Sequence, residues 1–251
     1  MQDFVTQALV RERAMLGTWV KLPCLEVVQM LGHAGFDFVV IDMEHSPMSL
    51  QRAAELVVCA QGVGLAALVR LADAGATTIQ PLLDAGADGL LVPRVTSVAV
   101  AEAVTRKMVF APAGERGLGS TSRAGTWGLG DMPAYLARGD RECARLVQLE
   151  DWASLEAAAE FAAIDSVGGI FIGHGDLYLS SGKPASDPEV RALTGRVLAT
   201  TRAAGKLSAA AAATPEDARL YCDMGFLLVM VSNDLTLFGK AALEAVGKVR
   251  G

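Results

Sequence analysis

Short apolar runs recur along the whole chain, and a segment with helical spacing follows most of them. The runs do not alternate between apolar and polar residues, which indicates strands buried on both faces, as in a parallel sheet covered by helices. They occupy residues 17–20, 37–41, 65–69, 88–92, 145–149, 168–172, 206–211 and 226–231. Eight such units in 251 residues predict an α/β fold, a (β/α)8 TIM barrel, with an open doubly wound sheet as the alternative.

Alanine-rich segments with helical spacing lie between these runs, at residues 48–60, 74–86, 152–163, 187–204 and 214–224. Three of them end in glycine just before the next run, in the stretches AQGVG, LDAGADG and CDMGF, as helices commonly do. We expect one barrel domain over residues 1–251. It would begin with an amphipathic helix and end with a helix capped by Asn233 or Asp234.

Composition narrows the classes of function. Hydrophobic residues make up 52% of the chain and charged residues 20%, enough for a sizeable core. The formal net charge of -6, without any basic run, argues against a nucleic-acid or anionic-membrane partner. No apolar stretch approaches the ~18 residues of a membrane span. The four cysteines are far apart, which is typical of reduced thiols in a cytoplasmic protein; they are Cys24, Cys59, Cys143 and Cys222.

Residues 107–140 do not follow the alternation of predicted strands and helices. This segment contains KMVFAPAGERGLGSTSRAGTWGLGDMP, which is rich in Gly, Ser, Arg and Pro. It is too long for an ordinary connection, and long loops in compact domains are usually functional or disordered. It does not follow a strand as a dinucleotide-binding glycine motif does, so it does not indicate an NAD site.

Polar side chains follow the apolar runs at the end where a barrel strand would stop. In this fold the carboxyl ends of the strands gather at one mouth, so residues dispersed in sequence converge in space. The residues at these positions are Asp42 and His45, Arg70, Pro93 and Arg94, Glu150 and Asp151, His174 and Asp176, and Ser232 and Asn233.

Glu150 and Asp176 follow two adjacent predicted strands. Two carboxylates at one barrel mouth suit a hard divalent cation such as Mg²⁺ or Mn²⁺, and would leave coordination positions for substrate and water. The alternative is that each carboxylate caps the helix that follows it. Gly173 and Gly175 flank His174, and glycines there let backbone N–H groups approach an anion.

Arg70 is the only cation at the end of its run, LAALVR. It can pair structurally with Asp42 or Glu44, or it can hold a carboxylate or oxyanion of a ligand. His45 can act as an acid or base near neutral pH, and the nearby Asp42 favours that function over a structural one. Lys21 is the only lysine near the carboxyl end of a strand, which makes a lysine-dependent aldolase a poor fit.

Several stretches resemble the HpcH/HpaI family of metal-dependent (class II) pyruvate aldolases. They are GTWVKLP, AGFDFVVIDMEHSPMSL, LVRLADAGATTIQPLLDAGADGLLVPRV, APAGERGLGSTSRA, VQLED and IFIGHGDLYLSSG, in family order from about residue 17 to 240. The resemblance implies a (β/α)8 barrel and a homo-oligomer, commonly a hexamer arranged as a trimer of dimers. Its last helix would be exchanged between subunits.

The resemblance also implies roles for individual residues. Glu150 and Asp176 match the metal ligands, for Mg²⁺, Mn²⁺ or Co²⁺. Arg70 matches the residue that contacts the keto oxygen of pyruvate. His45 matches the acid/base, with Asp42 as its dyad partner.

The remaining implied positions lie around the substrate. Asp84 matches an acid that is brought near a neighbouring subunit's site, and Gln148 matches a glutamine near the metal and its waters. The backbone around the metal aspartate would meet the substrate carboxylate, and we assign to this group Gly173, His174, Gly175 and Asp176. His174, Tyr178 and the alanine run after Ser208 depart from the family pattern.

These assignments predict a metal-dependent aldolase that reversibly cleaves a 4-hydroxy-2-keto acid to pyruvate, or hydroxypyruvate, and an aldehyde. One alternative is a phosphoenolpyruvate-mutase-like enzyme or a citrate-lyase-type acyl-CoA lyase on a related barrel. A CoA substrate would need a basic patch at the mouth, for which Arg94, Arg116 and Arg123 are the candidates. The other alternative is a barrel without enzymatic activity that binds small keto acids.

Overall fold

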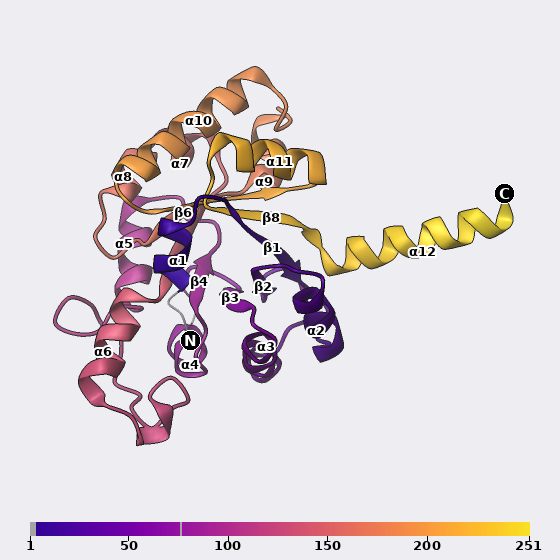
Figure 1. Cartoon of the computed structure of the whole chain (residues 1–251). Helices are drawn as coiled ribbons and strands as arrows, with labels where there is room; N and C mark the ends of the chain where they lie inside the picture. Colours follow the sequence, from indigo (N-terminus) through magenta and orange to yellow (C-terminus); the bar gives the residue numbers. More distant parts are fainter. Residues whose placement is uncertain (1–3, 76) are drawn as a thin grey trace.

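The computed structural model describes residues 4–75 and 77–251 and shows a closed barrel of eight strands (Figure 1). Each strand pairs in parallel with its neighbours in chain order, and the last strand closes on the first. The predicted (β/α)8 barrel is therefore confirmed. The strands are β1 (Met15–Val20), β2 (Phe38–Asp42), β3 (Ala66–Arg70), β4 (Gly89–Val92), β5 (Ala144–Leu149), β6 (Gly169–Ile172), β7 (Leu207–Ala212) and β8 (Leu228–Asn233).

Helices surround the barrel, and polar caps begin many of them. The helices are α1 (Phe4–Val10), α2 (Leu25–His33), α3 (Leu50–Gly62), α4 (Ile79–Asp84), α5 (Val98–Arg106), α6 (Met132–Arg141), α7 (Trp152–Glu156), α8 (Ala158–Ala162), α9 (His174–Ser181), α10 (Pro188–Ala203), α11 (Pro215–Met224) and α12 (Asp234–Arg250). In α10 and α11, Asp187 and Thr214 accept a hydrogen bond from the first turn, and a proline occupies the first helical position. The expected helix-ending glycines Gly64, Gly86 and Gly225 all adopt positive φ.

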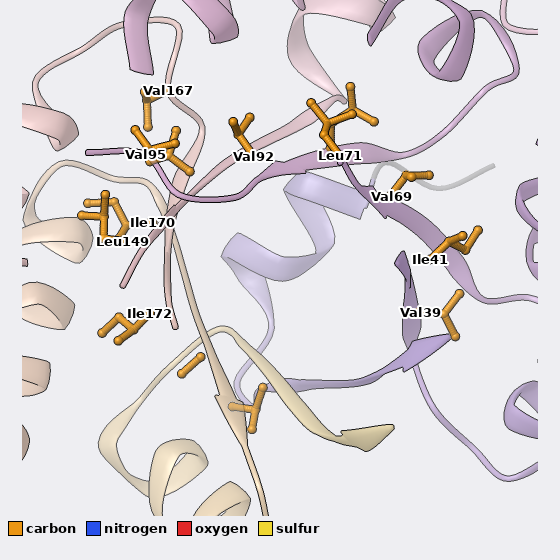
Figure 2. Close-up of a cluster of buried hydrophobic side chains, with 14 of the residues drawn as sticks. Val39, Ile41, Val69, Leu71, Val92, Val95, Leu149, Val167, Ile170 and Ile172 are labelled. Atoms are coloured by element: carbon orange, nitrogen blue, oxygen red, sulfur yellow. The ribbon is translucent and has the colours of Figure 1, made fainter. Parts of the chain in front are cut away.

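Side chains alternate between the inside and the outside of the barrel along each strand. On β2, Phe38 and Val40 belong to the cluster inside the barrel, whereas Val39 and Ile41 belong to the cluster between sheet and helices. Figure 2 shows part of the outer cluster, including Val39, Ile41, Val69 and Ile172. This burial on both faces explains why the strands read as continuous apolar runs rather than alternating ones.

Helix α1 closes the amino-terminal end of the barrel. Phe4 and Ala8 are buried in the inner cluster, and the ring of Phe4 packs 5.8 Å from that of Phe38. The predicted N-terminal helix is therefore present over 4–10; its first three residues lie outside the described part of the chain. With this end closed, the carboxyl ends of the strands form the open mouth.

Three predicted segments differ in detail from the structure. The helix expected over residues 74–86 is the shorter α4, and residue 76 lies outside the described residues. The helix expected over 152–163 is divided into α7 and α8 at Ala157. The irregular segment 107–140 contains a 3-10 turn, Thr126–Gly128, and most of α6.

Helix α12 projects away from the barrel (Figure 1). Asn233 caps it by accepting a hydrogen bond from the N–H of Thr236 at 2.9 Å. The other candidate cap, Asp234, instead accepts hydrogen bonds from the backbone of Lys21 and Leu22, which fixes the start of the helix to the end of β1. Among the described residues, no helix is long and apolar enough to cross a membrane.

Candidate active site

The strand alternation carries several predicted site residues onto the inner face of the barrel mouth. Asp42 lies two residues after Val40, Arg70 two after Leu68, and Gln148 two after Leu146. The three hydrophobic residues all belong to the inner cluster. Position parity alone therefore turns the polar residues at these strand ends toward the barrel axis.

Asp42 and Arg70 form a buried, two-pronged ion pair. Arg70 Nε donates to one carboxylate oxygen of Asp42 at 2.9 Å and Nη2 donates to the other at 2.7 Å. The guanidinium also lies 4.1 Å from the centre of the Trp19 ring. The structural pairing of Arg70 that the sequence left open is thus present, and the fork orients the guanidinium rigidly.

Glu44 connects this pair to the rim of the mouth. One of its oxygens lies 2.9 Å from Arg70 Nη1, and the other lies 3.0 Å from Arg94 Nε. The side chain of Glu44 is buried, whereas that of Arg94 is 67% exposed. Arg94 also adopts a positive φ of 52°, which is uncommon for a residue with a side chain and occurs often at functional sites.

The imidazole of His45 faces Glu44 rather than Asp42. Its Nε2 lies 3.6 Å from a Glu44 oxygen, while Asp42 contacts His45 through the backbone N–H, at 3.2 Å. The predicted Asp42–His45 dyad is therefore not formed through the ring in this structure. The ring itself is 45% exposed at the mouth, where a substrate can reach it.

Glu150 is a buried carboxylate with a strongly shifted pKa. Burial, together with the nearby negative charges of Asp176 and Glu44, raises its pKa to about 7. Hydrogen bonds from the backbone N–H of Arg94, at 2.8 Å, and from Gln148 Nε2, at 2.5 Å, act in the opposite direction. Glu150 and Asp176 therefore lie close enough to repel each other.

The surroundings of Glu150 and Asp176 fit a divalent cation. A cation would relieve the repulsion between the two carboxylates, and carboxylate oxygens are the ligands that Mg²⁺ and Mn²⁺ prefer. Beside Glu150, the buried Gln148 Oε1 has no hydrogen-bond partner among the described residues, so it can accept a bond from a metal-bound water. No group of three His, Cys, Asp or Glu side chains in the described part of the chain is placed to hold a metal.

Gly173 permits the close approach of β6 to Glu150. A Cβ atom at this position would lie 2.8 Å from the Cβ and from a carboxylate oxygen of Glu150, and 2.9 Å from Gln148 Nε2. Gly175, two residues later, has open space where a Cβ would lie. Only the first glycine is thus required by packing around the carboxylate.

The side chain of His174 is directed away from the carboxylates. Its Nε2 lies 3.1 Å from Thr194 Oγ1 on α10, and its ring stacks on Tyr221 of α11 with centroids 5.2 Å apart. Burial lowers the pKa of His174 to about 4, so the ring is neutral at neutral pH. The imidazole packs against α10 and α11; a role for its backbone in binding substrate stays a prediction.

Three predicted residues lie at the other end of the barrel. Asp84 is the last residue of α4, which leads down to the start of β4, and it accepts hydrogen bonds from Gln80. Arg116 lies 3.8 Å from Asp84, and Arg123 donates to the carbonyl of Ala85. Of the three arginines proposed for a CoA patch, only Arg94 is therefore at the mouth.

Three residues at the mouth are not among the predicted site residues: Trp19, Lys21 and Glu44. Trp19 stacks on Arg70, Lys21 Nζ lies 3.4 Å from Asp42, and Glu44 links two arginines. Trp19 and Lys21 continue the inward parity of β1, so the alternation that identifies Asp42 and Arg70 would also have identified them. Glu44 follows the strand, where parity no longer applies.

Comparison with known proteins places the chain among aldolases. Residues 15–241 match the family described as HpcH/HpaI aldolase/citrate lyase. The chain is 33% identical over 249 residues to a hydroxypyruvate/pyruvate aldolase of Pseudomonas aeruginosa, covering 98% of this chain and 92% of that protein. It is 35% identical over 237 residues to a 4-hydroxy-2-oxovalerate aldolase of Rhodococcus jostii, covering 93% and 91%.

A solved structure agrees with this similarity. An HpcH/HpaI aldolase/citrate lyase family protein from Burkholderia cenocepacia superposes with a TM-score of 0.90 at 27% sequence identity. The superposition covers the full length of both chains. The likeness therefore extends over the whole barrel.

Proposed function

Because this chain belongs to the HpcH/HpaI aldolase/citrate lyase family, we propose that it reversibly cleaves a 4-hydroxy-2-keto acid to an aldehyde and pyruvate or hydroxypyruvate. The family that its motifs predicted is confirmed, and membership makes the chain a carbon–carbon lyase. The relatives named as hydroxypyruvate/pyruvate and 4-hydroxy-2-oxovalerate aldolases support this class of substrate.

One observation carries the proposal: the buried Glu150 lies within range of the charge of Asp176, and the buried oxygen of its neighbour Gln148 has no hydrogen-bond partner among the described residues. We propose that Glu150 and Asp176 hold a divalent cation, either Mg²⁺, Mn²⁺ or Co²⁺. When bound, the cation would act as a Lewis acid that polarises the keto acid and stabilises developing negative charge.

The chain's own residues would supply orientation and proton transfer. Arg70, held by Asp42 and Glu44, presents its remaining N–H groups to the keto oxygen and stabilises the charge that forms there. The backbone N–H groups of Gly175 and Asp176, in the first turn of α9, orient the substrate carboxylate. His45, exposed at the mouth, accepts the proton of the 4-hydroxyl group.

The bond changes balance without a further reactant. Loss of the 4-hydroxyl proton to His45 forms the aldehyde carbonyl as the C3–C4 bond breaks. The electron pair of that bond becomes the C2–C3 double bond of the enolate, whose oxygen faces Arg70. Return of that proton from His45 to C3 then gives the methyl group of pyruvate, or the hydroxymethyl group of hydroxypyruvate, and restores neutral His45.

Pyruvate release from a 4-hydroxy-2-keto acid, measured before and after chelation, tests the proposal. Activity should fall to background in excess EDTA and return with Mg²⁺, Mn²⁺ or Co²⁺. Undiminished turnover in metal-free buffer would refute the metal role. Calorimetric binding of pyruvate without any turnover of a panel of aldehydes would instead favour a keto-acid-binding barrel, and turnover of an acyl-CoA would favour the lyase alternative.

We further propose that the enzyme is a cytoplasmic homo-oligomer, a hexamer built as a trimer of dimers, in which α12 is exchanged between subunits. Helix α12 leaves its own barrel, and its apolar side chains Leu235, Phe238, Leu243 and Val249 are 48%, 71%, 75% and 87% exposed. A second copy of the chain is the partner that would cover them. The four cysteines, all without disulfides, support the cytoplasmic location.

A further inference from the structure

A cavity of about 310 Å³ lies at the amino-terminal end of the barrel, opposite the mouth. Asp88 and Cys143, which directly precede β4 and β5, form its inner wall, and Phe4 of α1 borders it. Its outer wall comes from the segment 107–141, the long irregular segment that has no role in the proposed aldol reaction.

Three arginines of that segment line the cavity: Arg116, Arg123 and Arg138. Arg123 Nη1 donates to the carbonyl of Ala85 at 2.9 Å, and Arg138 Nη2 donates to that of Ala124 at 3.1 Å. Each of these two groups uses one of its five N–H bonds in that contact, which leaves donors for a ligand.

Two buried polar groups in the lining lack partners. Arg116 is 6% exposed and Tyr135 is 3% exposed. Within the described residues, neither Arg116 Nε nor the Tyr135 hydroxyl has a hydrogen-bond partner. Buried donors are almost always satisfied in folded proteins, so these two need acceptors from outside the described chain, supplied by a water or a ligand.

The acidic residues of the lining are already engaged. Asp88 accepts hydrogen bonds from the backbone of Ala67, at 2.8 Å, and from Gln61 Nε2, at 2.9 Å. Glu142 lies 3.4 Å from Arg141, which is outside the cavity. Arg116 has a distant carboxylate contact, 3.8 Å from Asp84. The lining thus has three guanidinium groups against two carboxylates that have other partners.

We propose that this cavity binds a small, doubly charged oxyanion. Inorganic phosphate, a phosphate monoester and a dicarboxylate all have this chemistry. Guanidinium groups match the paired oxygens of phosphate and carboxylate, and the Tyr135 hydroxyl adds a neutral donor. The apolar lining, from Phe4, Leu83 and Ala87, would accept a short carbon chain. The site is separate from the mouth and does not depend on the proposed aldol reaction.

Calorimetric titration of the full-length protein with inorganic phosphate, and separately with malonate, tests the proposal at constant ionic strength. We expect one binding site per chain for at least one of the two anions. Binding of phosphate would identify the ligand as a phosphate compound, and binding of malonate would identify it as a dicarboxylate. Arg123→Gln should weaken binding about tenfold and Tyr135→Phe about threefold. Tyr135→Phe removes only a hydroxyl that has no hydrogen-bond partner among the described residues, so this variant still tests the proposal if the arginine variant fails to fold.

Arg141→Gln is the matched control, because it removes the same charge from α6 outside the cavity. It should bind the anion as the parent protein does. Absence of binding for both anions at about 10 mM would overturn the proposal. So would affinity that is unchanged in Arg123→Gln and Tyr135→Phe, or that falls equally in Arg141→Gln.

Discussion

Asp42 and Arg70 are direct cross-strand partners in the barrel sheet, and their side chains meet in a buried fork of two hydrogen bonds, 2.9 and 2.7 Å long. The register of β2 and β3 brings the two residues side by side, and strand parity turns both toward the barrel axis. Asp42 also accepts backbone hydrogen bonds from Glu44 and His45. The fork therefore connects sheet register with the shape of the loop that carries the proposed base.

Asp42→Asn should lower the free energy of unfolding by about 3–5 kcal/mol, because it leaves the buried Arg70 paired with Glu44 alone. Urea denaturation measures the change. Glu244→Gln removes one partner of an exposed ion pair on α12 and should change stability by less than about 1 kcal/mol. Equal effects of the two variants would show that the fork contributes no more than a surface pair.

The stability difference between the parent protein and Asp42→Asn should depend on pH. Burial alone would raise the pKa of Asp42, but the hydrogen bond and charge of Arg70, the backbone N–H of His45 and the charge of Lys21 together lower it below its usual 3.8. A depressed carboxylate pKa stabilises the fold above the unfolded pKa and loses that effect as pH falls through the folded pKa.

The difference between the two proteins should therefore be constant near neutral pH and shrink below pH 3.8. Urea midpoints of both proteins, measured from pH 7 downward, follow it. Other titrating groups are common to both proteins and cancel in the difference. A gap that widened as the solution became more acidic would contradict the lowered pKa.

His45→Gln should reduce kcat for aldol cleavage by about 10²- to 10⁴-fold, the usual contribution of a general acid or base. Its half-exposed ring lies 3.6 Å from Glu44, so thermal stability should change little. His33→Gln, an exposed position at the end of α2, is the control and should keep parental kcat. Retention of activity by His45→Gln would remove this residue from the proposed mechanism.

Gly173→Ala should weaken Mg²⁺ or Mn²⁺ binding and reduce activity, because the added methyl group would push on Glu150 and Gln148. We expect about a 10- to 100-fold loss of metal affinity, measured by calorimetry. Gly195→Ala, where a Cβ meets open space on α10, is the control and should bind metal normally. If both variants bound metal equally well, Gly173 would not be needed to shape the site.

Phe238→Asp should reduce the mass of the oligomer in solution. The side chain is 71% exposed on α12, away from its own barrel, so a charge there should disturb only contacts with a second copy. Lys240→Glu changes charge on the same helix at an exposed polar position and should leave the mass unchanged. Light scattering after gel filtration distinguishes assembled protein from separated subunits; an unaltered mass for Phe238→Asp would argue against a role of this residue in assembly.

The sequence predicted the barrel and the strand ends well, because both depend on local patterns. All eight apolar runs are strands, since burial on both faces leaves an uninterrupted hydrophobic stretch. The parity of inward residues places Asp42, Arg70 and Gln148 at the mouth. Where the local pattern was weak, the prediction was less accurate: the alanine-rich stretch 152–163 contains two short helices in place of one.

The amino-acid order by itself therefore determined that Asp42, Arg70 and Gln148 face the mouth, because strand period and strand count are properties of neighbouring residues. Tertiary structure alone decided which groups pair there. In the folded chain the Asp42 carboxylate pairs with Arg70, the His45 ring faces Glu44, and the His174 ring stacks on Tyr221. It also gathered Arg116, Arg123 and Arg138 at the opposite end. Such choices depend on the distances and burial of residues far apart in the chain, which no local pattern contains.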